Sequence, residues 1–555
     1  MARSRTDRQS SDDVLQRLSP SLKRHEHCDI VDIHPGAGLW SSKLHDHIKP
    51  RSHILIEPDE KLYLPFLEPL LAKPDSRYRL ASAPTPGPGW ESYERVFSED
   101  FLPNQTRQAP TGSAVSNDAL LLVANMAYHP RKMNHGFGTS AQWLIHRFFA
   151  TMKDRSFFHA YGLVRMLIWV ADDEKSPVLP RTIGSRMKFT VQTEMCSSTE
   201  EIAGADGAAG FQRRQLAVDL ESARRVAKSM NARDIETPDD RKGVLHQRVT
   251  GASGAQNLTS LPENTPSDIV ESYGSRKWHD ELQALEKAFR EGGFKEFVHD
   301  PLPRVRKENT TTTAVKVTTV KKGQTKPQKT PEWERMHRLQ LTLRHQQKEH
   351  AIIENLSIEQ ADIETYETRL EDPRLSEDER VTRREELNKM IQQTQARLES
   401  AKKGVAVKVA FYSDDRRAFQ EDPPILMWDR RTAEPLVVRG DEFFPQHRMA
   451  LLDIQPKPAH MNKYFDLIVT SLFQHPTQSV QQGLDSLAPG AADALIPEVP
   501  ALRSRVNPGS LRIRMLTTEM LQGLADAWER WPFRPSLAEL MSLASIHIED
   551  VLTDE

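Results

Sequence analysis

A glycine turn between an apolar strand and a helix constrains the fold of this chain most strongly. The run Asp29–Ile33 carries an acid near its end, Asp32, and is followed by Gly36 and Gly38. Glycines there let the backbone approach a ligand closely, and the next helix begins with free N–H groups. Asp32 is placed to hold an amino group, and Glu57, about 20 residues beyond the glycines, lies where a carboxylate accepts ribose hydroxyls. The pattern predicts a nucleotide-cofactor loop; an ordinary tight turn beside a surface glutamate is the alternative.

Strands and helices alternate over residues 12–200. Helical patterns lie at 39–47, 61–71 and 141–152, between continuous apolar runs that predict strands at 29–33, 52–57, 119–124 and 163–170. Strands that are apolar along their whole length and separated by helices are typical of a parallel sheet covered on both faces. The sequence therefore predicts an α/β core in this region.

An Asn-x-x-Tyr motif follows one of these strands directly. Asn125 comes after the apolar run Leu120–Ala124, and Tyr128 comes three positions later. A side-chain oxygen such as that of Asn125 accepts the N–H bonds of an adenine amino group, and a tyrosine ring stacks on an extruded base. The motif predicts a base-positioning site. A turn asparagine followed by a core tyrosine is the alternative interpretation.

Residues 201–331 are rich in Gly, Ala, Ser, Thr and charge, which predicts a low-complexity basic insertion. Within 303–331 one acid, Glu308, stands against eight basic residues: Arg304, Arg306, Lys307, Lys316, Lys321, Lys322, Lys326 and Lys329. Such a segment cannot build a core of its own. A solvated linker is one interpretation. The other is a nucleic-acid contact, for which the candidates are Arg304, Arg306, Lys307, Lys321 and Lys322.

The last third of the chain divides into three predicted parts. Residues 332–404 form a charged helical hairpin, with a break at Asp372-Pro373 and an apolar seam made of Met336, Leu339, Leu343, Leu387, Ile391 and Leu398. Residues 405–460 return to the core with a last strand at 449–454, and 461–555 form a helical domain. One face of a helix in that domain carries Leu521, Leu524, Trp528 and Trp531.

The composition excludes several classes of protein. The net charge of −3 over 555 residues gives no general attraction to nucleic acid, so such binding needs local patches. Two cysteines fit a reducing compartment rather than a disulfide scaffold. The longest apolar runs fall short of the ~18 residues of a membrane span. The histidines near Cys28 lack the further ligands of a metal site, so we predict no metal and no membrane.

The motifs in this order resemble the rRNA adenine N6-dimethyltransferase family, and most closely its fungal mitochondrial transcription factor branch. They are Asp32-x-x-Pro-Gly36-x-Gly38, Ile-Glu57 and Asn125-Met-Ala-Tyr128, joined by 185–189, 443–445 and 514–519. The resemblance covers about 12–200 and 435–545. It implies an α/β, class I S-adenosylmethionine methyltransferase (Rossmann-like) sheet with a helical C-terminal domain and a large charged helical insertion. S-adenosylmethionine would be held by Asp32, Gly36, Gly38 and Glu57.

Several departures separate the chain from the active enzymes that it resembles. His34 and Ala127 stand where those enzymes usually have Gly and Pro. No acid lies between Tyr78 and Trp90, where the adenine of the cofactor is bound, and Phe473-Gln-His-Pro476 replaces a basic turn that grips RNA. Each of these missing interactions is worth ~1 kcal/mol or more. Together they predict that cofactor binding is weakened or lost.

The resemblance implies three functions. The first is a mitochondrial matrix transcription initiation factor, a monomer that helps a single-subunit mitochondrial RNA polymerase to recognise and melt promoter DNA. The second is an S-adenosylmethionine-dependent rRNA adenine N6-dimethyltransferase that acts on small-subunit rRNA, with Asn125 and Tyr128 positioning the target base. The third is a ribosome-assembly binding protein. The departures favour the first function, whereas the retained Glu57 and the Asn125-x-x-Tyr128 motif favour the second.

Overall fold

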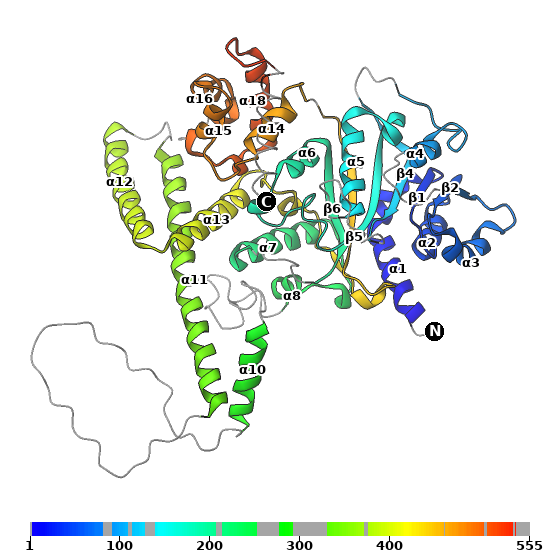
Figure 1. Cartoon of the computed structure of the whole chain (residues 1–555), viewed down its shortest axis with the longest axis horizontal. Helices are drawn as coiled ribbons and strands as arrows, with labels where there is room; N and C mark the ends of the chain where they lie inside the picture. The colour runs from blue at the N-terminus through cyan, green and yellow to red at the C-terminus, as the bar shows by residue number, and fades with distance from the viewer. Residues whose placement is uncertain are drawn as a thin grey trace, which may run out of the picture. The chain divides into compact units, whose positions relative to one another are not determined.

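The computed structural model contains, within its described residues, one mixed sheet of eight strands (Figure 1). The strands follow the order β3-β2-β1-β4-β5-β8-β6-β7. Their bounds are β1 Asp29–Ile33, β2 Ser52–Ile56, β3 Tyr78–Ala81, β4 Ser116–Asn125, β5 Leu163–Ala171, β6 Ser197–Gly204, β7 Leu436–Val437 and β8 Met449–Pro456. The structure describes residues 3–81, 91–108, 114–127, 139–206, 214–251, 277–291, 330–370, 376–459, 461–503, 508–536 and 539.

The sheet is parallel through its first five positions. Strands β3, β2, β1, β4 and β5 pair in parallel, and β8 runs antiparallel between β5 and β6. All residues of β1 and β5 are buried, as expected of apolar strands covered on both faces. The predicted α/β core is therefore confirmed, and its predicted strands agree with the observed ones to within a few residues.

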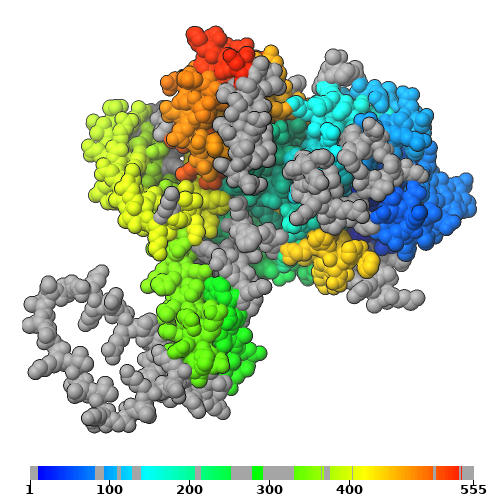
Figure 2. All heavy atoms as spheres, in the orientation of Figure 1, coloured from blue at the N-terminus to red at the C-terminus, as the bar shows by residue number. Residues whose placement is uncertain are grey.

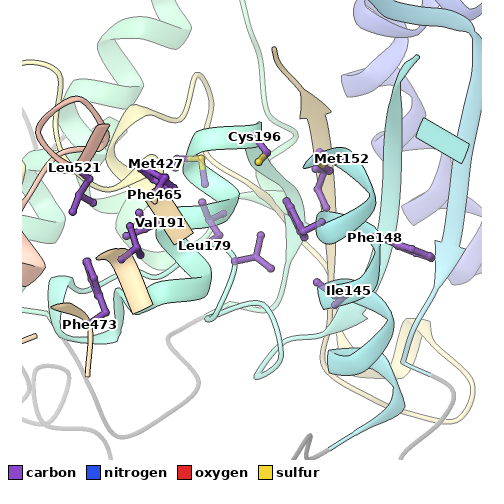
Figure 3. Close-up of a cluster of buried hydrophobic side chains, with 14 of the residues drawn as sticks. Ile145, Phe148, Met152, Leu179, Val191, Cys196, Met427, Phe465, Phe473 and Leu521 are labelled. Atoms are coloured by element: carbon purple, nitrogen blue, oxygen red, sulfur yellow. The ribbon is translucent and has the colours of Figure 1, made fainter. Parts of the chain in front are cut away.

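Helices cover both faces of the sheet. Those packed around it are α1 Arg3–Leu22, α2 Leu39–Ile48, α3 Glu60–Leu71, α4 Glu91–Glu94, α5 Ser140–Asp154, α6 Lys188–Cys196, α7 Leu216–Ala232, α8 Val244–Thr250 and α13 Lys403–Gln420. Helices α1 and α2 join Ile30 of β1 in one apolar cluster, and α5 and α6 join Val31 in a second (Figure 3). Because neighbouring strand residues point to opposite faces, both faces of β1 are covered.

The C-terminal helices extend the second apolar cluster beyond the sheet. They are α14 Phe465–Leu472, α15 Val480–Leu487, α16 Ala491–Leu495, α17 Pro500–Arg503 and α18 Thr518–Arg530. Figure 2 shows their orange and red surface beside the cyan and green surface of the α/β core. The predicted face of α18 is confirmed, since Leu521, Leu524 and Trp528 are buried and Trp531 lies half-buried at its end.

Two adjacent acids of α13 join the core to these C-terminal helices. Asp414 forms ion pairs with Arg512 and Arg514, the second at 2.6 Å. Asp415 accepts a hydrogen bond from the Ile183 N–H at 2.6 Å. Both carboxyl groups are fully buried. Helix α13 is therefore part of the molecular core, between two regions that are far apart in the sequence.

The core continues past residue 200, where the sequence predicted that it would end. Strand β6 runs to Gly204, and α7 buries Val218, Ala223 and Val226 at helical spacing. These side chains are small, so the composition of the segment hides an ordinary helix–core contact. The ordered part of 201–251 thus differs from the low-complexity insertion that we predicted. The five-part division of the chain stays a prediction in its other boundaries.

The first arm of the predicted hairpin packs against a different helix from the one we expected. Residues 262–355 form a second unit, separate from 1–261 with 356–555. In this second unit, Met336, Leu339 and Leu343 of α11 (Pro331–Leu370) pack against α10 (Lys277–Arg290). Further along α11, Glu359 pairs with Arg397 of α12 (Glu377–Ser400). The predicted break at Asp372-Pro373 lies outside the described residues, and no described helix is long and apolar enough to cross a membrane.

Candidate cofactor and base site

The predicted cofactor and base residues meet at one edge of the sheet. Strand β1 lies between β2 and β4, and the last residues of all three strands are neighbours in the register. Asp32, Glu57 and Asn125 stand at or directly beside these strand ends. The carboxyl ends of parallel strands are where α/β proteins bind ligands. The structure therefore brings together residues that are almost a hundred positions apart in the sequence.

The glycine turn has the conformation that its residues require. Gly36 and Gly38 have φ angles of +59° and +69°, in the left-handed region that favours glycine. Helix α2 begins at Leu39, directly after Gly38, as predicted. A Cβ atom added to Gly38 would lie 3.0 Å from Leu67 and 3.2 Å from Leu70, because α3 packs closely against the turn. Both the backbone angle and the packing therefore demand glycine at position 38.

The carboxylate of Glu57 is bonded within the protein. Its Oε2 accepts the Gly36 N–H at 2.9 Å and its Oε1 accepts the Asp59 N–H at 3.0 Å. The side chain is 1% exposed. Burial raises the pKa of Glu57, against the two N–H bonds, which lower it. The group that was expected to accept ribose hydroxyls thus ties the glycine turn to the start of α3.

Asp32 faces a stack of aromatic and imidazole rings. Its Oδ2 lies 3.4 Å from Nε2 of His53, and both side chains are buried. His53 bonds His45 through their Nδ1 atoms at 3.1 Å, and both rings stack with Tyr78. Burial, followed by the neighbouring His53, lowers the pKa of His45 to about 4. Asp32 is therefore engaged beneath the turn, and its contact with a ligand stays a prediction.

His34 lies between the ends of β1 and β4. Its φ angle is +58°, and its imidazole is buried. Nδ1 lies 3.3 Å from the Asn125 carbonyl oxygen and Nε2 lies 3.1 Å from the Tyr93 hydroxyl. A carbonyl only accepts, so Nδ1 carries the proton and Nε2 accepts from the tyrosine. Burial, with the nearby Glu57, raises the pKa of Tyr93 to about 12, so its hydroxyl keeps its proton.

Sequence reasoning missed Tyr93. The residue lies on α4, a helix of one turn that follows the Pro- and Gly-rich stretch 82–90. A helix this short has no periodic apolar pattern to detect. The substitution of His for the usual Gly at position 34 was visible in the sequence, whereas its hydroxyl partner was not. The structure thus adds one side chain to the predicted site.

Asn125 ends β4 and shapes the turn that follows. Its side-chain Oδ1 accepts the Ala127 N–H at 3.2 Å, which is an Asx-type turn. Next to it in the sheet, Trp169 of β5 makes edge contacts with Trp40 at 5.9 Å and with Phe443 at 5.4 Å. Asn125 therefore stands beside an aromatic cluster. Tyr128 lies outside the described residues, as do Arg304, Arg306, Lys307, Lys321 and Lys322.

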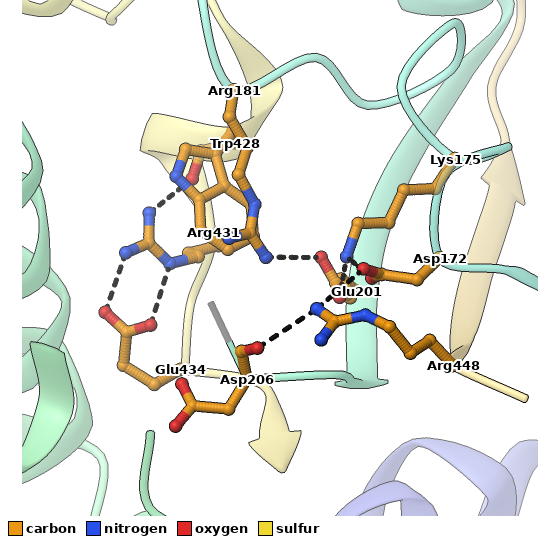
Figure 4. Close-up of polar contacts among 9 residues, drawn as sticks. All are labelled: Asp172, Lys175, Arg181, Glu201, Asp206, Trp428, Arg431, Glu434 and Arg448. Carbon is orange, nitrogen blue, oxygen red and sulfur yellow. Dashed lines mark hydrogen bonds and ion pairs between the residues drawn. The ribbon is translucent and has the colours of Figure 1, made fainter. Parts of the chain in front are cut away.

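A network of ion pairs closes the same edge of the sheet at β5 and β6, with the buried Asp172, Lys175 and Glu201 at its centre (Figure 4). The Lys175 ammonium lies 2.5 Å from Asp172 and 2.6 Å from Glu201. Arg448, which precedes β8, donates to Asp172 at 3.2 Å, and Arg181 pairs with Glu201 at 3.3 Å. The network continues through Trp428, Arg431 and Glu434. Because these charges are paired with one another, they hold the strand ends together.

The residues as arranged do not fit S-adenosylmethionine. Glu57 is 1% exposed and each of its oxygens already accepts one backbone N–H, so it presents almost no surface to a ribose, and the His34 imidazole fills the space between the ends of β1 and β4. A groove of about 730 Å³ lies elsewhere, between α1 and α2, and is lined by residues such as Leu15, Leu39 and Lys43. Cofactor binding therefore requires at least His34 and Glu57 to change their contacts.

The sheet and the turn together define the class of protein. A parallel run ordered 3-2-1-4-5, one antiparallel strand beside it and a glycine turn after β1 are the features of the class I S-adenosylmethionine-dependent methyltransferase fold. The predicted Rossmann-like fold is thus confirmed.

Comparison with known proteins gives two similar sequences. No family model matches the chain. It is 25% identical over 198 residues to mitochondrial transcription factor 1 of Saccharomyces cerevisiae, and 24% identical over 192 residues to that of Saccharomyces paradoxus. Each match covers 34% of this chain and 50% of the other, so the chain spans about half the length of the curated relatives it matches. The chain is thus similar, over about a third of its length, to two fungal mitochondrial transcription factors.

A solved structure is also similar. The crystal structure of a dimethyladenosine transferase from Plasmodium falciparum aligns with 51% of this chain and 96% of its own, at 8% identity and a TM-score of 0.22. A likeness at this TM-score adds nothing to the fold already described.

Proposed function

We propose that this chain is a mitochondrial transcription initiation factor that uses a methyltransferase fold as a scaffold. It assists a single-subunit mitochondrial RNA polymerase in the matrix, as a monomer, by recognising promoter DNA and stabilising its melted form. The sequence relation to two mitochondrial transcription factors supports this function.

The position of His34 is the observation that carries the proposal. Its imidazole spans the strand ends over which a methyl donor would lie, bonded to the Asn125 carbonyl on one side and to Tyr93 on the other. Glu57 holds the glycine turn instead of a ribose. Because His34 and Glu57 make these contacts within the protein, the carboxyl ends of the strands serve as a preformed binding surface rather than as an open cofactor cleft.

The same edge offers groups that hold an unpaired base. Asn125 lies half-buried at the end of β4, and no residue in the described part of the chain accepts from its amide nitrogen. That nitrogen is therefore available to donate to a base edge, and Tyr128 follows as a stacking ring. Binding a base that has already left the duplex stabilises melted DNA, because it favours the open state over the closed one.

Promoter-dependent transcription tests this function. Purified mitochondrial RNA polymerase is assayed with and without the chain, on a linear duplex promoter and on the same promoter melted in advance. We expect transcripts from the duplex only when the chain is present, and a much smaller dependence on the melted template. Equal transcription from the duplex with and without the chain would overturn the proposal.

An rRNA adenine N6-dimethyltransferase is the alternative function. It is favoured by Glu57 and Asn125, which stand at the strand ends where such an enzyme needs them. Asn125 would orient the adenine amino nitrogen, with positioning as the main source of catalysis. Methylation of small-subunit rRNA by the purified chain, abolished in Asn125→Ala, would replace the first proposal. Binding to ribosomal subunits without methylation would indicate the assembly role.

A further inference from the structure

One face of α5 carries aromatic and basic side chains at helical spacing. Trp143, His146 and Arg147 lie three and four positions apart, on the more exposed side of the helix from Ile145 and Phe148, and part of Trp143 packs against the apolar cluster that holds those two residues (Figure 3). The Arg147 guanidinium lies 5.7 Å from the centre of the Trp143 ring. Trp143 and His146 are half-buried, and Arg147 is exposed. Helix α5 begins at the same carboxyl edge of the sheet as Asn125, because its N-cap residue Thr139 bonds Glu174, which follows β5.

Helix α6 completes this surface with a ring and a cation. The Phe189 ring stacks on His146, with their centres 3.5 Å apart and their planes 21° from parallel. Burial, followed by the charge of Lys188, lowers the pKa of His146 to about 4, so the imidazole is neutral at physiological pH. Met187, beside them, is 47% exposed. The surface is therefore a flat aromatic pair with an apolar border.

Lys188 has no anionic partner in the described parts of the chain. It is half-buried, and its pKa is lowered by burial and then by Lys153. The nearby carboxylate, Asp466, is already used by Lys153 and by Gln192. A half-buried ammonium beside a second cation is stabilised by an anion from outside. A phosphate supplies that anion, and a base attached to it supplies a flat face for the rings.

We propose that Trp143, His146, Arg147, Lys188 and Phe189 form a second contact for single-stranded nucleic acid. Aromatic faces beside basic groups are the means by which proteins bind unpaired strands without reading their sequence. This inference deepens the proposed function and rests on it: the strand that reaches Asn125 continues along α5 and α6. Within this surface, Lys188 binds a phosphate and the Phe189–His146 pair stacks on a base.

Binding of a fluorescent oligodeoxythymidine measures the effect of each group in the full-length chain. We expect Phe189→Leu to weaken binding by roughly 5- to 100-fold, the range for removal of one stacked base. Lys188→Gln should weaken binding and reduce the slope of log K against log salt by about 0.7, the value for one phosphate contact on a single strand. Phe533→Leu and Lys389→Gln are matched controls, since both residues are exposed and lie on other helices or loops.

Photocrosslinking of the same oligonucleotide, carrying 5-iodouracil, locates the contact independently of folding effects. We expect crosslinks on α5 or at the start of α6. Crosslinks that map only elsewhere, or unchanged binding by Lys188→Gln, would overturn the inference. Lys188→Gln that impairs capture of the polymerase but not of the oligonucleotide would make this surface a protein contact. If any of these contrary results is found while promoter-dependent transcription persists, the proposed function stands and this inference fails.

Discussion

His34 shows how a single residue can change what a binding edge does. A non-glycine residue at a φ angle of +58° carries a backbone strain of about 1–3 kcal/mol, which the surrounding contacts must offset. The bonds to Asn125 and Tyr93 provide that compensation inside the fold. The imidazole thus fills the space between the ends of β1 and β4 with contacts made inside the fold.

Replacing this residue tests whether it closes the cofactor site. His34→Gly removes both the imidazole and the left-handed strain, so we expect S-adenosylmethionine to bind at least about tenfold more tightly than to the wild type, or ~1.4 kcal/mol. Calorimetric titration measures both affinities. The double variant His34→Gly with Glu57→Ala is the control, and it should lose the gain. Equal affinities of wild type and His34→Gly would show that the imidazole is not the obstacle.

Replacing Gly38, the second glycine of the turn, is expected to lower the stability of the fold. Gly38→Ala should destabilise the fold by about 2 kcal/mol or more, because it combines a left-handed angle with a Cβ atom 3.0 Å from Leu67. Gly490→Ala is the matched control: its φ angle is +76°, but nothing lies within 4 Å of the added atom. It should cost only about 1 kcal/mol. Denaturant midpoints compare the two, and a cost for Gly38→Ala no greater than that of the control contradicts the packing argument.

The candidate site could be predicted in part. Asp32, Glu57 and Asn125 stand at the ends of apolar strands, and strand ends are visible in a sequence. The direction in which each side chain points was not visible, because it depends on partners from other elements. Glu57 bonds the glycine turn and Asp32 faces His53. Such internal bonds give these residues a structural role, and their contact with a ligand stays a prediction.

Among the elements, apolar strands were predictable and polar ones were not. Strand β6 is Ser-Ser-Thr-Glu-Glu-Ile-Ala-Gly, which does not look like a strand with a neighbour on each side. It is tolerated there because Lys175 and Arg181 neutralise its buried Glu201. Lys175 and Arg181 precede Glu201 by some twenty residues, so no local sequence pattern predicts the strand.

Helical stripes indicate that a partner exists, but not which one. The stripe of Met336, Leu339 and Leu343 has the spacing of a helix–helix contact, and the structure supplies that contact through α10 rather than α12. Helix α10 lies inside the segment that we predicted to be low-complexity. Its apolar residues, Trp278, Leu282 and Leu285, are few and are separated by charges. Periodicity therefore predicted the apolar face of α11 but not the face of α10 that packs against it.

Helix α13 gives a prediction about pH. Burial raises the pKa of Asp415 from 3.8 to about 7. The folded protein therefore holds this proton more tightly than the unfolded chain, so stability from this group is full below about pH 4 and is lost as the pH rises to about 7. Each pH unit in that window costs up to about 1.4 kcal/mol.

The variant Asp415→Asn isolates this effect. Its neutral side chain still accepts the Ile183 N–H, so we expect it to be at least as stable as the wild type at pH 7 and to show a flatter dependence on pH between 4 and 7. Thermal unfolding across this range measures the difference. Asp493→Asn, at an exposed aspartate, is the control. A profile of Asp415→Asn that follows the wild type throughout would mean that the buried carboxyl group does not titrate there.

At the scale of the whole molecule, charge is unevenly distributed. The chain carries −3 overall, whereas 303–331 holds eight basic residues and one acid. Replacing five of these basic residues with glutamine should weaken binding to promoter DNA at low salt. It should also reduce the slope of log K against log salt, by up to about 0.9 for each phosphate that is no longer neutralised. The five are Arg304, Arg306, Lys307, Lys321 and Lys322. Fluorescence anisotropy over a salt series measures this, and an unchanged slope would leave the segment a linker.

The order of the strands also affects whether sheets of separate molecules can pair through their edge strands. The described sheet ends in β3, of four residues, and in β7, of two, while its longer apolar strands are enclosed between neighbours. An edge strand exposes unpaired N–H and C=O groups, and a long one is a template for another chain. Edges this short offer almost no such template. The arrangement that gathers the candidate site in the middle of the sheet therefore also guards the protein against edge-to-edge aggregation.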